Sequence, residues 1–248
     1  TSLLISGYDY IRKVPGFFDG EFVVQDQSSC LAVKAAGINE GDLVVDVCAA
    51  PGGKTMYAAM LTGSEGHVIS RDLIDKKTEL IEENIERLGL SNVTVQVHDA
   101  REFDEELTGK ADVVIADLPC SGLGIMGRKN DIKYHVSMES VKELAQLQRE
   151  ILDTVCRYVK PGGTLVYSTC TIDSIENDEN AVWFADTHDF SLCGIDDVVP
   201  EHGGERGFVT LHQGIDECDG FFISKFRADS NNQIGQEQIC LLYTSDAA

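Results

Sequence analysis

Short apolar runs alternate with amphipathic stretches along most of the chain. Five runs rich in apolar and β-branched residues are typical of strands in a parallel sheet that is buried on both faces. They occupy residues 43–48, 67–71, 93–98, 111–116 and 164–168. Segments with helical periodicity lie around them, at about residues 30–36, 54–61, 80–88, 138–158 and 176–187. This alternation predicts an α/β fold with a mostly parallel, doubly wound sheet flanked by helices.

Local signals refine several boundaries. Residues suited to ending or capping helices stand at Gly37, Gly89 and Ser137, and a Pro-Gly-Gly sequence at 161–163 stops the long helix. Four further short strands are expected at residues 8–11, 20–24, 207–211 and 220–226. The last two predict a hairpin, which would place an antiparallel strand at the sheet edge.

Composition limits the class of protein. The 248 residues are 43% hydrophobic, enough for one large core. No apolar run is long enough to span a membrane, and no leader peptide opens the chain, so no membrane association is expected. The eight cysteines form no C-x-x-C pair and no zinc-spaced cluster. We therefore expect no metal, no disulfide framework, and free thiols in a reducing cytoplasm.

The charge of the chain is strongly acidic. A formal net charge of −22 argues against a protein that binds nucleic acid mainly by bulk electrostatics, although local basic contacts stay open. A solvated acidic surface explains the excess. The loop at 128–134 is a rare basic spot, where Arg128 and Lys133 lie beside an aromatic residue. Either they contact phosphate groups or they are ordinary solvated cations.

A tight turn of small residues follows the first predicted strand. It consists of Cys48, Ala49, Ala50, Pro51, Gly52, Gly53 and Lys54. Adjacent glycines let the backbone approach a ligand, and the helix that follows offers free N–H groups. The turn matches neither the dinucleotide G-x-G-x-x-G fingerprint nor the G-x-x-x-x-G-K-[ST] phosphate loop. It indicates a cofactor loop of another kind, or a plain turn without a ligand.

Carboxylates and thiols follow the other strands. Asp72 stands where a ribose diol is usually held, and Asp99 where an adenine amino group could be met; both could also be simple turn residues. Asp117 and Cys120 follow the fourth strand, and Cys170 follows the fifth. Because neighbouring parallel strands end at the same edge, we expect the two cysteines to lie close together. Accidental proximity of two buried cysteines is the competing explanation.

Three motifs together resemble those of a known family. The segments 46–55, 117–122 and 167–171 are similar to the cofactor, proline-cysteine and threonine-cysteine motifs of the Sun-family RNA cytosine-C5 methyltransferases, above all the members that act on 16S ribosomal RNA. Residues 20–29 and 219–222 also resemble that group. The resemblance covers about residues 5–227. It implies a Rossmann-like methyltransferase domain at 29–228, after an extension or RNA-binding remnant at 1–28. Residues 229–248 are expected to be a disordered or artefactual tail.

The resemblance also implies a chemistry. S-adenosylmethionine would be bound by the 48–54 loop together with Asp72, Asp99 and Asp117. Cys170 would attack carbon 6 of cytosine in RNA, Cys120 would assist release of the adduct, and Asp117 would hold the base. A thiolate at carbon 6 makes carbon 5 enamine-like, so that it accepts a methyl group. A monomer is favoured.

Several different functions are also consistent with the sequence. DNA cytosine-C5 methyltransferases use the proline-cysteine thiol as nucleophile and do not need Cys170, so the second cysteine favours RNA. The same chemistry on transfer RNA or another ribosomal site stays open, as does a non-catalytic cofactor- or RNA-binding fragment. A nicotinamide oxidoreductase is disfavoured by the absent dinucleotide fingerprint. The sequence also departs from the family: Asn130 and Gln213 replace common prolines, and an N-terminal helical domain is not seen.

Overall fold

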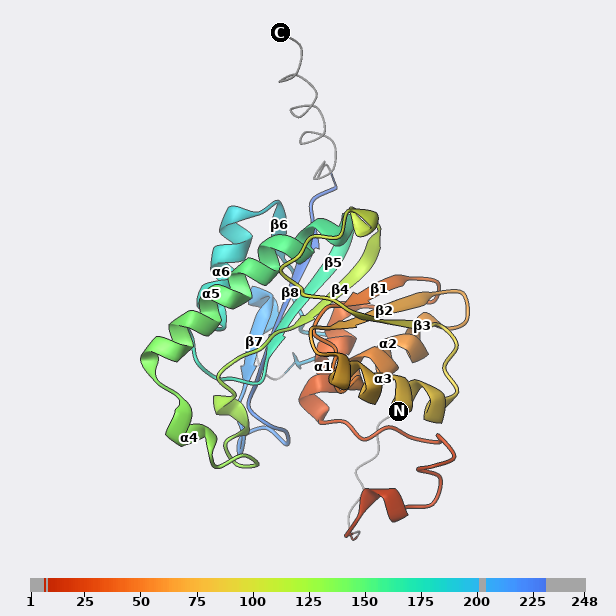
Figure 1. Cartoon of the computed structure of the whole chain (residues 1–248). Coiled ribbons are helices and arrows are strands. Elements are labelled where there is room, and N and C mark those ends of the chain that lie inside the picture. Colours follow the sequence, from red (N-terminus) through yellow and green to blue (C-terminus); the bar gives the residue numbers. More distant parts are fainter. Residues whose placement is uncertain (1–6, 8, 201–203, 231–248) are drawn as a thin grey trace.

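The computed structural model describes residues 7, 9–200 and 204–230. Within them lies an eight-stranded sheet of order β3-β2-β1-β4-β5-β8-β6, with β7 also paired to β8 (Figure 1). The parallel strands are β1 (Leu43–Asp46), β2 (His67–Asp72), β3 (Val93–Val97), β4 (Ala111–Asp117) and β5 (Val159–Thr169). The predicted doubly wound, mostly parallel sheet is confirmed.

The C-terminal part of the sheet is antiparallel. Strand β8 (Phe221–Ala228) runs antiparallel to β5 along one side. On its other side it pairs with β7 (Phe208–Leu211) through residues 221–224 and with β6 (Phe190–Leu192) through residues 226–228. The predicted hairpin of β7 and β8 is therefore confirmed. Strands β6 and β7 both lie on the outer side of β8, each along a different part of it.

Helices cover both faces of the sheet (Figure 1). One face carries α1 (Gln27–Ala36), α2 (Gly53–Thr62) and α3 (Asp75–Leu88), and the other carries α5 (Met138–Val155) and α6 (Asp178–Thr187). Side chains alternate between the two layers, as strand geometry requires. Val44 belongs to the core under α1 and α2, and Val45 belongs to the core under α5 and α6.

The helix boundaries predicted at Gly37, Gly89 and Ser137 are confirmed. Gly37 and Gly89 follow α1 and α3 with the left-handed backbone that glycine tolerates. Ser137 caps α5, and its side chain exchanges hydrogen bonds with Ser140.

Two boundaries differ from the prediction. Helix α5 ends at Val155, and β5 begins at Val159 instead of Thr164. The Pro-Gly-Gly sequence is thus inside the strand limits, at a register shift between β4 and β5. A bulge of this kind places Pro161, which has no N–H group, outside the ladder of hydrogen bonds.

The strand expected at 20–24 is wrong. Residue 20 lies in a turn, and residues 21–24 have no regular secondary structure. The strand expected at 8–11 is also wrong over its described residues 9–11, because a 3₁₀ helix begins at Ile11 (Ile11–Lys13). The guanidinium group of Arg87, on α3, donates hydrogen bonds to the carbonyls of Phe17 (2.8 Å) and Phe22 (3.1 Å). A side chain therefore takes the place of a neighbouring strand as hydrogen-bond partner.

Parts of the segments expected at the two ends lie outside the described residues. These are Tyr8, in the other strand expected near the N-terminus, and residues 231–248 of the expected tail. The division into an extension, a catalytic domain and a tail stays a prediction. Every helix in the described part of the chain is too short or too polar to cross a membrane.

Candidate functional site

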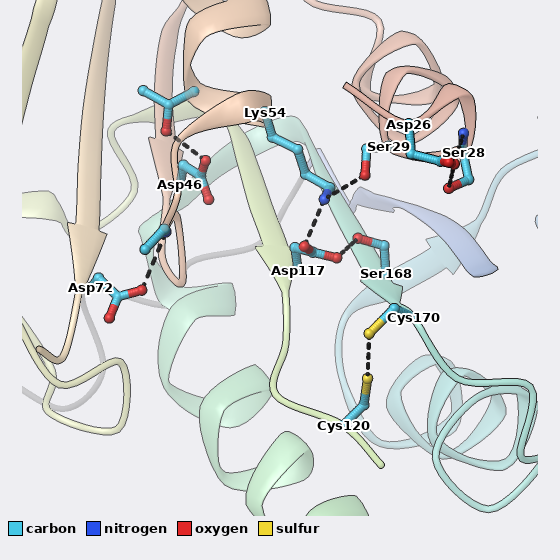
Figure 2. A network of polar contacts seen from close by, with 12 residues as sticks. Asp26, Ser28, Ser29, Asp46, Lys54, Asp72, Asp117, Cys120, Ser168 and Cys170 are labelled. Carbon is cyan, nitrogen blue, oxygen red and sulfur yellow. Dashed lines mark hydrogen bonds and ion pairs between the residues drawn. The ribbon is translucent and has the colours of Figure 1, made fainter. Parts of the chain in front are cut away.

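The candidate residues gather where the parallel strands end (Figure 2). The loops after β1, β2, β4 and β5 meet at this edge because these strands are neighbours and point the same way. The site has two parts. We call the loop at 48–54 with Asp72 the cofactor side, and the loops that carry Cys120 and Cys170 the thiol side.

The loop at 48–54 joins β1 to α2 and is fixed by short hydrogen bonds. The N–H of Ala49 donates to the carbonyl of Arg71 (2.8 Å), and the N–H of Ala50 donates to the carboxylate of Asp72 (3.2 Å). Gly52 has a φ of +100°, which side chains other than glycine rarely adopt. The loop therefore enters α2 with the N–H groups of its first turn unused by the helix.

A buried carboxyl group lies beneath this loop. Asp46, the last residue of β1, is fully buried and accepts a hydrogen bond from the hydroxyl of Thr55 (2.7 Å). Burial raises its pKa to about 7, despite this hydrogen bond and the nearby Lys54. Burial likewise raises the pKa of the Cys48 thiol far above its usual range, which disfavours its thiolate. The cofactor role of Cys48 stays a prediction.

Lys54 joins the two sides of the site. Its ammonium group, on α2, lies 2.6 Å from the carboxylate of Asp117 and donates to the hydroxyl of Ser29 (3.2 Å). Asp117 also accepts a hydrogen bond from Ser168 (2.7 Å), so its carboxylate is held from both sides. The Lys54 side chain is 10% exposed and that of Asp117 is 29% exposed. The carboxylate is thus fixed and still open to a ligand.

The thiols of Cys120 and Cys170 face each other. Their sulfur atoms are 3.3 Å apart, which confirms the proximity expected from the strand ends. A hydrogen bond from the Cys120 thiol lowers the pKa of Cys170 against the effects of burial and of Asp117. The same hydrogen bond, with burial, raises the pKa of Cys120. Cys170 is therefore the better thiolate of the pair, and Cys120 holds its proton.

A buried carboxylate that the sequence did not single out supports the thiol side. Glu176 is fully buried and accepts hydrogen bonds from the Ser121 backbone (2.9 Å), the Ser121 hydroxyl and the Gln148 amide (3.0 Å). Gln148 in turn donates to the carbonyl of Pro119 (2.9 Å). These contacts hold the residues on both sides of Cys120. The sequence offered no signal for Glu176 beyond its nearness to Cys170.

Three of the predicted site residues make ion-pair or cation–π contacts with other residues of the chain. Asp99 forms a two-pronged pair with Arg101, whose Nη2 lies 2.6 Å from Oδ2. Arg128 pairs with Asp26 and Asp219. Lys133 lies 4.9 Å from the ring centroid of Tyr134. The adenine role of Asp99 and the phosphate roles of Arg128 and Lys133 stay predictions. Within the described residues, no three His, Cys, Asp or Glu side chains group as metal ligands.

Comparison with curated proteins identifies relatives over most of the chain. A family model described as 16S rRNA methyltransferase RsmB/F matches residues 34–227. The chain is 42% identical to the probable ribosomal RNA small subunit methyltransferase B of Bacillus subtilis, over 85% of this chain and 48% of that protein. It is 35% identical to an Escherichia coli ribosomal RNA small subunit methyltransferase F, over 84% of this chain and 45% of that protein. The chain thus spans about half the length of these relatives.

Two solved structures have the same fold as this chain. A crystal structure titled PH0851 superposes with a TM-score of 0.83 at 31% identity, over 89% of this chain and 50% of that one. The structure of NSun6 from Pyrococcus horikoshii with SFG superposes with a TM-score of 0.76 at 29% identity, over 89% of this chain and 56% of that one.

Proposed function

The chain belongs to the RsmB/F family of 16S rRNA methyltransferases, and on that premise we propose that it methylates carbon 5 of a cytosine in RNA. The methyl donor is S-adenosylmethionine, and 16S ribosomal RNA is the proposed substrate. The names of the relatives support the RNA substrate. The paired thiols support the position of methylation on the base.

The cofactor side fits S-adenosylmethionine. Gly52 is the residue that this turn requires, because its φ is +100° and a Cβ there would lie only 2.9 Å from Met56. The free N–H groups at the start of α2 suit the carboxylate of the methionine part. Asp72, at the end of β2, suits the ribose diol, and one structural neighbour was solved with the S-adenosylmethionine analogue SFG. When bound, S-adenosylmethionine supplies an electrophilic methyl group.

Cys170 is the proposed nucleophile. Its thiolate adds to carbon 6 of the cytosine, which forms a sulfur–carbon bond and makes carbon 5 nucleophilic. Carbon 5 then takes the methyl group. Water then takes the proton from carbon 5, and the electron pair of that C–H bond expels the Cys170 sulfur as a thiolate, which restores the ring. The hydrogen bond from Cys120, 3.3 Å away, favours the ionised form of Cys170 that this sequence needs.

Four neighbouring side chains complete the proposed chemistry. Cys120 carries a proton beside the departing sulfur, so it assists release by stabilising the Cys170 thiolate. Asp117 accepts hydrogen bonds from the exocyclic amino group of the base, and Lys54 and Ser168 keep its carboxylate in place. The base must leave any stack to reach these groups, which is least costly in single-stranded or looped RNA.

The observation that carries this proposal is the contact between the two thiols. A DNA cytosine methyltransferase would need only the thiol of the proline-cysteine loop, here Cys120. This chain places a second thiol at hydrogen-bonding distance and gives it the lower pKa. The arrangement therefore favours RNA as the substrate and Cys170 as the attacking residue.

Transfer of labelled methyl groups tests the proposal. The protein is incubated with labelled S-adenosylmethionine and undermethylated ribosomal RNA, transfer RNA or DNA, and the product nucleosides are identified. Label in ribosomal RNA as 5-methylcytosine is the expected result. Label only in transfer RNA would change the substrate and keep the chemistry. Label on another atom, or in DNA alone, would contradict the proposal.

A further inference from the structure

The guanidinium group of Arg128 bridges two carboxylates from distant parts of the chain. Its Nη2 lies 2.7 Å from Asp26, and its Nε lies 3.0 Å from Asp219. The two aspartate side chains are only 16% and 8% exposed, whereas that of Arg128 is 62% exposed. We call these three residues the clasp. The Nε–Nη2 edge of the guanidinium fork, which could otherwise bind a phosphate group, is engaged within the protein.

One arm of the clasp leads to Lys54. Asp26 is the N-cap of α1, and it accepts hydrogen bonds from the backbone (3.0 Å) and hydroxyl (2.6 Å) of Ser28. The next residue, Ser29, accepts a hydrogen bond from Lys54, which is paired with Asp117. Figure 2 shows Ser29 pointing from this helix toward the ammonium group of Lys54.

The other arm leads to the backbone of Cys170. Asp219 precedes Gly220, whose N–H donates to the carbonyl of Gly124 (2.9 Å), and the N–H of Gly124 donates to the carbonyl of Cys170 (3.0 Å). The two backbone segments are in close contact, since a Cβ at Gly220 would lie 2.7 Å from the Cα of Gly124. Arg128 is therefore four residues from Gly124, whose N–H is hydrogen-bonded to the backbone carbonyl of Cys170.

We propose that Arg128 is a positioning residue that sets the contact between Cys120 and Cys170 by tying their loops to α1 and to the loop before β8. The assignment of Cys170 as nucleophile rests on the proposed function, but the geometry of the clasp does not. Arg128 acts through the peptide chain described above and not by touching the substrate. Its guanidinium is held by Asp26 and Asp219 before any RNA arrives.

The electrostatics explain why an arginine is needed. Asp219 has its pKa raised by burial and by the negative charge of Asp26, while Arg128 opposes this increase. Burial also raises the pKa of Asp26, but hydrogen bonds from Ser28 and the charge of Arg128 outweigh burial and leave it lowered. Without Arg128, two poorly solvated carboxylates would repel each other. A lysine has one ammonium group and cannot span both in the same way.

The pH dependence of Cys170 alkylation tests the clasp without RNA or cofactor. The full chain is treated with iodoacetamide across a pH series, and the rate at Cys170 is followed by mass spectrometry. Cys120, Asp117 and Lys54 are the titratable groups that influence Cys170 directly. In Arg128→Ala, loss of the Cys120 hydrogen bond should move the midpoint up by about half a pH unit or more. The turnover number for methyl transfer should fall about tenfold through misplacement of the thiol.

Matched variants separate the clasp from a phosphate contact. Arg128→Lys would preserve a phosphate contact but not the bridge, so its midpoint should also rise. Asp219→Asn removes one arm and should give a smaller rise. Lys129→Ala removes a positive charge from the same turn without touching the clasp, so its midpoint should match that of the wild type. If Arg128→Ala fails to fold, judged by circular dichroism, the Arg128→Lys and Asp219→Asn variants carry the test.

The opposite pattern would overturn the inference. An unchanged alkylation profile in Arg128→Ala and Arg128→Lys, with an effect only on the Michaelis constant for RNA and its salt dependence, would make Arg128 a phosphate ligand. Failure of the proposed function has a different signature. It would appear as no methyl transfer by the wild-type protein, while the alkylation differences among the variants remain measurable.

Discussion

The two sides of the site are built in different ways. On the cofactor side, the proposed ligand contacts come mainly from backbone groups of one loop and of the first turn of α2. The residues that support this loop lie nearby in the sequence, up to Asp72 at the end of β2. On the thiol side, the two cysteines are 50 residues apart, and Glu176 and Gln148 hold the Cys120 loop from other elements. The first side depends on local backbone geometry, and the second depends on long-range side-chain contacts.

The proposed cofactor binding and the proposed reaction are therefore supported by different kinds of contact at one edge of the sheet. Lys54 is the direct link between them, because it lies on α2 and pairs with Asp117 at the end of β4. Changes on the thiol side should therefore affect the reaction more than cofactor affinity. Changes beneath the cofactor loop should affect stability and its pH dependence more than the state of the thiols.

Replacement of the proposed nucleophile should have the largest effect. Cys170→Ala should lower the turnover number at least about ten-thousand-fold, because no other thiol can form the bond to carbon 6. The dissociation constant for S-adenosylmethionine, measured by calorimetry, should stay within about twofold of the wild-type value. Full activity in this variant, or loss of cofactor binding in parallel with activity, would break the separation between the two sides.

The buried carboxyl group of Asp46 should dominate the pH dependence on the cofactor side. The unfolded chain loses this proton near pH 3.8, whereas the folded protein keeps it up to about pH 7. The folded state thus binds more protons between these values, so stability falls as pH rises through this window. Asp46→Asn removes this titrating carboxyl group and its effect on the pH dependence of stability. Relative to the variant, the wild type should lose up to about 4 kcal/mol of unfolding free energy between pH 4 and pH 7.

Denaturant unfolding at several pH values measures this difference. The wild-type curve should fall more steeply with pH than that of Asp46→Asn, and the difference should level off above about pH 7. Parallel curves for the two proteins would show that Asp46 is ionised in the folded state across the window. That result would remove the buried acid from the account of the cofactor side.

A smaller effect is expected at Glu176. Glu176→Gln removes the negative charge that accepts hydrogen bonds from Ser121 and Gln148, so these buried bonds lose their charge assistance. The free energy of unfolding should fall by about 2 kcal/mol. Methyl transfer should fall about tenfold, because Cys120 shifts with its loop. Cofactor affinity should remain near the wild-type value.

The matched control for this variant is Asp186→Asn. Asp186 is an exposed acid on α6, the helix that begins two residues after Glu176, and the change removes the same charge without a buried contact. Its stability and activity should match those of the wild type within about 0.5 kcal/mol. Equal effects of the two variants would mean that charge, and not the buried hydrogen bonds, supports the thiol side.

The contrast between the two sides also explains what the sequence could predict. The loop at 48–54, Asp72 and the mostly parallel sheet follow from local patterns, namely apolar runs, adjacent glycines and an acid at a strand end. The nearness of Cys120 and Cys170 was predictable as well, because it needs only the rule that neighbouring strands end at one edge. These features depend on backbone topology, which short-range sequence patterns encode.

The remainder depends on contacts that no local pattern encodes. Glu176 is one of many acids in an acidic chain, and only the folded structure shows that it is buried against Ser121. The pairing of Arg128 could not be predicted, because its two acidic partners lie about 100 residues before it and 91 residues after it. The strand expected at 20–24 failed for the same reason, since Arg87 on α3 donates a hydrogen bond to the carbonyl of Phe22.

The most direct measurement of the central claim is trapping of the covalent adduct between protein and RNA. Wild type, Cys120→Ala and Cys170→Ala are incubated with undermethylated ribosomal RNA and S-adenosylmethionine, then separated on a denaturing gel. The account predicts a slow-migrating complex in Cys120→Ala, where release is impaired, and none in Cys170→Ala. A complex in Cys170→Ala and none in Cys120→Ala would reverse the two roles and contradict the assignment of Cys170 as nucleophile.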